Sequence, residues 1–222
     1  MKKKILLGLT TIAKGQWKEK IKEIDQLGIK EIALFPTCLD LKERKALYLL
    51  LKKTGLKSIP HVHLREQDME KWELNWLVKK YKTKVFNVHP VKGALKLIKN
   101  NKVYRNKIFV ENLKLPDKMF RKVLKNCGGI CLDLTHWQDY KVRQQPRVDQ
   151  FKKLFDKNKI GCNHVSAFNK INRHSTHYFK NLKEFDYLRN DLEYFSNIIS
   201  LELENSFKEQ LVVKRFLEKI IF

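Results

Sequence analysis

Seven side chains that can bind metal ions each follow a short apolar run in this sequence. They are His61, His89, Glu111, Asp133, His164 and the pair Glu202 and Glu204. The runs before them are residues 56–60, 85–88, 107–110, 129–132, 160–163 and 197–201. Imidazole and carboxylate groups are common ligands for divalent cations. Six successive runs that end in this way predict one shared metal site.

The apolar runs have the composition and length of buried strands. Runs rich in Ile, Val, Leu and Phe recur about every 25 to 30 residues, and segments with helical periodicity separate them. We count eight such units, beginning with strands at residues 4–8 and 29–35. In a (β/α)8 barrel the active site lies at the carboxyl ends of the strands, where these seven side chains fall. The sequence therefore predicts an α/β fold, a TIM barrel forming a single domain over residues 1–222.

The segments between the strands complete this prediction. The predicted helices span residues 16–26, 41–53, 66–81, 91–99, 117–125, 147–158, 182–195 and 208–221. A chain of 222 residues is at the short end for a fold of roughly 250, so we expect short loops. No Pro/Gly/Ser-rich linker divides the sequence.

The amino-terminal segment and the cysteines bear on cellular location. Residues 5–13 are apolar and follow three lysines, a pattern that also occurs in signal peptides. We interpret them as the first barrel strand, because a barrel without it would have an open edge. The four cysteines, Cys38, Cys127, Cys131 and Cys162, lack CxxC or zinc-finger spacing and predict reduced, mostly buried thiols. No run approaches the roughly 18 apolar residues that span a bilayer, so we expect a cytoplasmic protein without a membrane partner.

The net charge of +23 has two interpretations. A strongly basic domain can neutralise nucleic-acid phosphates, and the release of counterions then drives binding. Alternatively, lysines spread over every helix, together with abundant Asn and Ile, are typical of an AT-rich genome. The charge alone does not decide between them.

Further polar residues next to the metal-capable side chains form recognisable motifs. They read Pro60-His61, Asn87-Val88-His89-Pro90, Glu111-Asn112, Ile130-Cys131-Leu132-Asp133-Leu134-Thr135-His136, His164, Asn172-Arg173-His174 and Leu203-Glu204. In this order they resemble the metal-ligand motifs of endonuclease IV-type (family 2) apurinic/apyrimidinic endonucleases, a branch of the xylose isomerase-like barrels. The resemblance covers the chain from the third predicted strand to its end.

The resemblance implies up to three zinc ions and hydrolysis of the DNA backbone 5′ to an abasic site, a reaction of DNA base excision repair. The implied ligands are His61, His89, Glu111, Asp133, His136, His164, Asn172, His174, Glu202 and Glu204. His63 points the same way as His61 by strand alternation, but the Pro-His pair favours His61.

Catalytic roles and DNA contacts are implied in the same way. Glu111 would bridge two ions, and Glu202 or Glu204 would align or deprotonate the attacking water. Basic residues near the barrel mouth are expected to hold phosphates of an abasic duplex. They are Arg65, Lys92, Lys170 and Arg173.

Two other functions remain open. A sugar isomerase or epimerase of the same superfamily would bind a single Mn, Mg or Co ion through Glu111, Asp133, His164 and one strand-eight carboxylate. Such a site does not need the additional imidazoles His61, His89, His136 and His174. Asn172 stands where the endonucleases carry Asp, and an amide is a poorer zinc ligand, so one ion could be weakly held or lost. A barrel that binds nucleic acid without catalysis is the third interpretation. We expect a monomer in each case.

Overall fold

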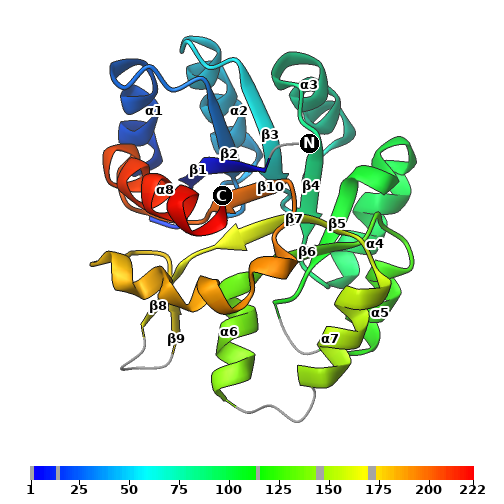
Figure 1. The fold of residues 1–222 in the computed structure, drawn as a ribbon. Coiled ribbons are helices and arrows are strands. Elements are labelled where there is room, and N and C mark those ends of the chain that lie inside the picture. Colours follow the sequence, from blue (N-terminus) through cyan, green and yellow to red (C-terminus); the bar gives the residue numbers. More distant parts are fainter. Residues whose placement is uncertain (1–2, 14–15, 114–115, 144–147, 170–173) are drawn as a thin grey trace.

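A closed barrel of eight parallel strands forms the centre of the computed structural model, with helices around it (Figure 1). The structure describes residues 3–13, 16–113, 116–143, 148–169 and 174–222. The barrel strands are β1 Lys4–Thr10, β2 Glu31–Phe35, β3 Ser58–His63, β4 Val85–Val88, β5 Ile108–Glu111, β6 Ile130–Asp133, β7 Ile160–Val165 and β10 Ile198–Leu201. They are ordered β1-β10-β7-β6-β5-β4-β3-β2, which confirms the predicted TIM barrel.

Helices connect these strands and cover the outside of the barrel. The α-helices are α1 Gln16–Gln26, α2 Leu41–Lys52, α3 Lys71–Tyr81, α4 Lys92–Asn100, α5 Lys118–Leu124, α6 Leu134–Val142, α7 Val148–Lys157 and α8 Phe207–Ile221. The 3-10 helices are η1 Lys102–Lys107, η2 Leu182–Asn190 and η3 Leu192–Tyr194. A small antiparallel hairpin, β8 Ala167–Asn169 with β9 His174–Thr176, follows β7.

The first and last strands pair with each other and close the barrel. Lys4 of β1 lies opposite Ile198 of β10, in parallel register. Gly8 approaches the Leu201 carbonyl so closely that an added Cβ would lie 1.7 Å from its oxygen. The buried Gln210 side chain of α8 accepts a hydrogen bond from the Gly8 amide and donates one to the Gly8 carbonyl. This junction has no room for a side chain larger than glycine.

Apolar side chains fill two layers. Inside the barrel, a small cluster contains Leu6, Ala33, Phe35, Val85, Phe109, Cys131, Cys162 and Ile198. A larger cluster lies between the strands and the helices, as the near-continuous apolar strands require. All four cysteines are free thiols: Cys131 and Cys162 are buried, Cys127 is half-buried and Cys38 is exposed. Among the described helices, none is long and apolar enough to cross a bilayer.

Several predicted boundaries differ from the structure. β3 continues to His63, beyond the predicted end at Pro60. The predicted helix at residues 66–81 begins only at Lys71, because residues 64–70 form a loop. Residues 182–195 form 3-10 helices instead of an α-helix. Helix α6 was not among the predicted helices, although Asp133 caps it by accepting hydrogen bonds from the amides of Thr135 and His136.

A buried ion-pair network joins α2 to α3. The guanidinium of Arg44 donates to both carboxylate oxygens of Glu73, over 2.8 and 2.9 Å, and both side chains are fully buried. Arg44 also donates to Asp68 at 2.9 Å, and the Tyr48 hydroxyl donates to Glu73 at 2.8 Å. The network therefore fixes the loop between β3 and α3.

Candidate metal centre

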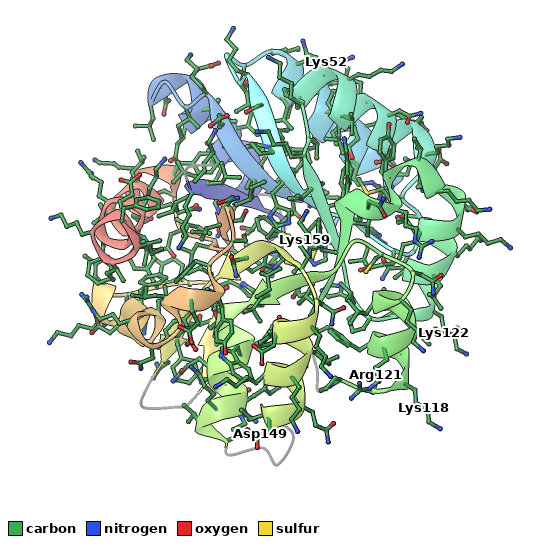
Figure 2. All side chains as sticks on the ribbon, turned by 45° about the vertical axis from the view of Figure 1, so that its right-hand side comes forward. Lys52, Lys118, Arg121, Lys122, Asp149 and Lys159 are labelled. Carbon is green, nitrogen blue, oxygen red and sulfur yellow. The ribbon has the colours of Figure 1, made fainter. Side chains whose placement is uncertain are left out.

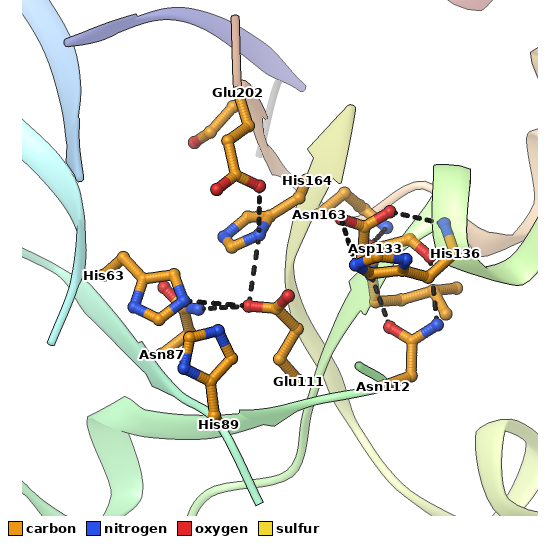
Figure 3. A network of polar contacts seen from close by, with 12 residues as sticks. His63, Asn87, His89, Glu111, Asn112, Asp133, His136, Asn163, His164 and Glu202 are labelled. Atoms are coloured by element: carbon orange, nitrogen blue, oxygen red, sulfur yellow. Dashed lines mark hydrogen bonds and ion pairs between the residues drawn. The ribbon is translucent and has the colours of Figure 1, made fainter. Parts of the chain in front are cut away.

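Side chains from the carboxyl ends of β3, β4, β5, β6, β7 and β10 converge at one end of the barrel (Figure 3). Glu111, the last residue of β5, lies at the centre. Its Oε2 atom is 3.1 Å from His63 Nε2 and 3.3 Å from His164 Nδ1. It also accepts a hydrogen bond of 2.7 Å from the Asn87 amide. The converging imidazoles outweigh burial and hold the pKa of Glu111 well below its usual range, so the group is a carboxylate.

The nitrogen atoms of His63 have separate partners. Nδ1 lies 3.1 Å from the Leu64 carbonyl oxygen, which can only accept, so Nδ1 carries the proton. The other nitrogen, Nε2, faces Glu111 Oε2 at 3.1 Å, and a metal ion bound there would take its lone pair. A histidine that binds a metal usually donates its other ring N–H to a carbonyl or carboxylate in this way.

His89 is oriented by a carboxylate that the sequence analysis did not identify. Glu66, in the loop after β3, accepts a hydrogen bond from the His89 amide and lies 3.2 Å from His89 Nδ1. The His63 and His89 rings are 4.4 Å apart between centroids. Burial lowers the pKa of His89, but Glu66 and Glu111 raise it to about 9. The position of Glu66, three residues after His63, is the only sequence signal for its role.

His61 lies deeper in the barrel than His63. Both of its nitrogens have polar partners, Ser200 Oγ at 2.7 Å and Asn87 Oδ1 at 3.0 Å. His61 thus holds Asn87, and Asn87 donates to Glu111. We predicted His61 in preference to His63, whereas the structure places His63 beside His89 and Glu111. The reason is the length of β3, which brings the second histidine to the strand end.

Asp133 is held through its backbone and its side chain. Its amide donates to Asn112 Oδ1 over 2.6 Å, and its carbonyl accepts from Asn112 Nδ2 over 3.0 Å. One carboxylate oxygen caps α6, and the other lies 3.8 Å from His136 Nε2. Burial, with the nearby Glu111 and Glu202, raises the pKa of Asp133. A cation would compensate this concentration of buried carboxylates.

His164, near the carboxyl end of β7, provides the clearest evidence for a bound metal ion. It is fully buried, and its Nε2 atom has no polar partner among the described residues. Nδ1 lies 3.3 Å from both Glu111 and Glu202. Burial lowers the pKa of His164, but these two carboxylates raise it to about 10. Because buried polar atoms rarely lack a partner, this environment fits a metal ligand.

The metal-capable side chains form overlapping groups. One group is His63, His89 and Glu111; the next is Glu111, Asp133 and His136; another is Asp133, His164 and Glu202. Within each group, the ligand atoms lie within 4.8 Å of one another. Glu111 and Asp133 each belong to two groups. Each therefore has a neighbouring ligand set on either side, as a bridging or shared ligand requires.

A fourth group of metal-capable side chains lies deeper inside the barrel. It contains His61, Cys131 and His164. Because His61 already has two hydrogen-bond partners, we assign it to support of the site and not to metal binding.

The structure separates the two carboxylates that follow β10, Glu202 and Glu204. Glu202 lies beside His164, and the His164 imidazole outweighs burial and lowers the pKa of Glu202 to about 2. Glu204 is absent from the ligand groups found among the described residues. Its amide instead donates to the His177 carbonyl. Of these two carboxylates, Glu202 is therefore the one that lies in the metal centre.

The remaining predicted residues lie at the edge of the centre or outside the described part. His174 is exposed in β9 and joins no ligand group there. Asn172, Arg173 and Lys170 fall outside the described residues. Of the predicted phosphate-binding residues, Arg65 forms an ion pair of 3.1 Å with Asp68, and Lys92 is exposed at the start of α4.

A matched pair of substitutions on β3 separates a ligand from a positioning residue. We expect His63→Gln to remove about one bound metal ion, because His63 Nε2 faces Glu111. We expect His61→Gln to keep the metal content but reduce turnover by about 10-fold to 100-fold, because Asn87 and Glu111 lose their support. Elemental analysis of both purified variants, beside the unchanged protein, measures this. Loss of an ion from the His61 variant alone would reverse the two assignments.

Comparison with known proteins gives a fold but no family. No protein-family model matches the chain, and a search of curated proteins gives no match. Among solved structures, a xylose isomerase domain protein from Alicyclobacillus acidocaldarius subsp. acidocaldarius aligns with 100% of this chain and 98% of its own. The TM-score is 0.50 and the sequence identity is 14%. The shared feature is the fold. At this identity it is the barrel architecture, and not a particular reaction, that the two chains have in common.

Proposed function

We propose that this protein is a zinc-dependent phosphodiesterase of the endonuclease IV type, which cleaves DNA 5′ to abasic sites. The observation that supports this most is the row of overlapping ligand groups joined by Glu111 and Asp133. A centre for a single ion needs only one such group. Several adjacent groups with shared carboxylates suit a cluster of ions, of the kind that phosphodiester hydrolysis uses, better than the single ion of the isomerase alternative.

The residues present fit such a cluster. His63 and His89 would hold one ion with Glu111, and His164 and Glu202 would hold another with Glu111 and Asp133. His136 would contribute to a further ion, with His174 and Asn172 as its other proposed ligands. Bound zinc would supply Lewis acidity, activate water and stabilise the charge of the departing oxygen.

Protein groups around the ligands would keep the reactive geometry fixed. Asn87, held by His61, orients Glu111 through a hydrogen bond of 2.7 Å. Glu66 orients His89, and Asn112 clamps the backbone of Asp133. The proposed role of Glu202 is to align or deprotonate the attacking water. Abasic duplex DNA is the proposed partner, and a cytoplasmic monomer is the proposed state.

A sugar isomerase or epimerase is the second candidate. Glu111, Asp133, His164 and Glu202 alone form the set that the superfamily implies for one Mn, Mg or Co ion. The convergence of His164 with Glu111 and Glu202 is consistent with that site as well. The imidazoles of His63, His89 and His136 would then be left without a role.

Metal content and cleavage specificity, measured together, test the proposal. Protein purified without added metal or chelator is expected to carry two to three zinc ions. It is expected to nick a duplex with one abasic analogue on the 5′ side of the lesion, because a cluster can stabilise both reacting oxygens. The same duplex with a normal nucleotide at that position is the control. A single non-zinc ion with an intact abasic duplex would contradict the proposal and favour the isomerase.

A further inference from the structure

The end of the barrel opposite the metal centre carries a ring of lysines. The residue immediately before each of six barrel strands is lysine: Lys3, Lys30, Lys57, Lys84, Lys107 and Lys159. They precede β1, β2, β3, β4, β5 and β7, and β1 to β5 are consecutive neighbours around the barrel. Parallel strands all begin at one end, about 4.8 Å apart, so these lysines lie close together. We call this set the lysine ring.

Glu31 brings a carboxylate to this end of the barrel, where it pairs with Lys4, which is outside the ring, and also interacts with Lys84. Lys30, Lys57, Lys84, Lys107 and Lys159 are exposed. Within the described part of the chain, no ion pair includes a ring lysine. No Asp or Glu occurs in the segments that lead into the barrel strands, all of which the structure describes. These segments are residues 27–30, 53–57, 82–84, 101–107, 125–129, 158–159 and 195–197.

Composition alone does not explain this distribution. The chain has 47 Lys and Arg against 24 Asp and Glu. If the charged residues were distributed at random, roughly one in three at any surface would be acidic. The loops at the opposite end of the barrel mix the two signs, with Asp40, Glu66, Asp68 and Glu70 beside Arg65 and Lys92. Helix dipoles favour lysines in the last helical turn. Lys107 ends the 3-10 helix η1, but the other ring lysines lie outside the helices.

A groove continues the basic surface beside the ring. It has a volume of about 660 Å³ and runs between α4, η1 and α5. Lys102, Arg105 and Lys122 line it, and Leu95 and Ile98 contribute its apolar part. Figure 2 shows Lys159 near the centre of the barrel, and Lys118, Arg121 and Lys122 along α5 at its edge. A chain of phosphates can follow such a groove, whereas a flat bilayer cannot enter it.

We propose that the lysine ring and this groove bind the phosphodiester backbone of nucleic acid, at the end of the barrel away from the metal centre. The binding is independent of base sequence, because the surface offers charge and no set of groups directed at base edges. It goes beyond the proposed reaction and does not depend on it. The surface would hold the protein on intact nucleic acid while the metal centre remains free.

Charge reversal at the ring tests the proposal. The variant carries Lys57→Glu, Lys84→Glu and Lys107→Glu, and its control carries Lys45→Glu, Lys96→Glu and Lys152→Glu on outer helix surfaces. Binding of a fluorescent intact duplex and of single-stranded RNA is measured over a range of salt concentrations. The ring variant is expected to bind at least about tenfold more weakly at low salt, with a salt slope reduced by about three. The control is expected to change affinity less than about threefold.

Other outcomes separate this proposal from the proposed function. Equal weakening by both triple variants, or no binding by the unchanged protein, would overturn the ring as a binding surface. If the ring variant lost binding to anionic vesicles but kept its binding to nucleic acid, the ring would be a membrane-binding surface and the proposal would be overturned. Lysine acetylation mapped by mass spectrometry, with and without duplex, gives a second readout that needs no variant: the ring lysines should be protected. Cleavage of abasic duplex by the ring variant tests the reaction separately.

Discussion

Replacing Glu111 with glutamine is expected to reduce turnover by about a thousandfold or more, and to remove about two metal ions. Glu111 belongs to two ligand groups and lies within 3.3 Å of both His63 and His164. Glutamine keeps the size and can still accept from Asn87. It has no negative charge and only one coordinating oxygen, so it is a poor bridge between cations. Elemental analysis and steady-state kinetics on the purified variant measure both effects.

The control for this prediction is Glu31→Gln. It removes a half-buried carboxylate at the other end of the barrel, where Glu31 pairs with Lys4. Metal content and turnover are expected to stay within about twofold of the unchanged protein. A Glu111→Gln variant that retained its full metal content would show that Glu111 does not bridge ions. If the unchanged protein carried a single ion and Glu111→Gln lost it, the result would favour the isomerase.

Replacing Glu73 with alanine is expected to destabilise the protein by about 3 to 5 kcal/mol, because the fully buried Arg44 guanidinium would lose its main partner. Asp68, which is 36% exposed, is the only other carboxylate in contact with Arg44 among the described residues. Urea unfolding followed by circular dichroism measures the change in free energy. The loop that carries Glu66 is fixed by the same network, so metal affinity should fall as well.

A double variant controls for the effect of the buried charge. Arg44→Met combined with Glu73→Leu removes both charges and retains apolar volume. It is expected to be more stable than Glu73→Ala, because no unpaired charge remains in the core. A loss below about 1 kcal/mol in Glu73→Ala would mean that Asp68 and the Leu39 carbonyl satisfy Arg44 without Glu73.

The barrel was predictable because its strands are buried on both faces and therefore appear as nearly continuous apolar runs. Strand ends were less predictable. The Pro60-His61 pair favoured His61 as the strand-end ligand, but the strand continues to His63, and this extension decides which histidine reaches Glu111. Local sequence did not reveal it, because the pairing of β3 with β4, from His61 to His63, sets the length.

The metal-binding side chains could be predicted from the strand ends, whereas the residues that orient them could not. Glu66 reaches His89 from a loop, and the sequence shows it only as a charged residue before a helix. Asn87 appears as one polar residue in an apolar strand, and its contacts with His61 and Glu111 come from neighbouring strands in the barrel. The distribution of charge between the two barrel ends likewise appears only when the strand starts are brought together.

The junction at Gly8 and Gln210 affects how the chain can reach its folded state. The hydrogen bond between these residues joins positions 202 apart in sequence, and β1 has no second strand partner until β10 is available. During synthesis the amino-terminal half would therefore exist with unpaired strand edges on β1. Contacts of such large sequence separation form slowly, because closing the loop costs entropy before any pairing compensates for it. Barrel closure is thus a late event, which leaves the nascent chain exposed to aggregation until α8 has been made.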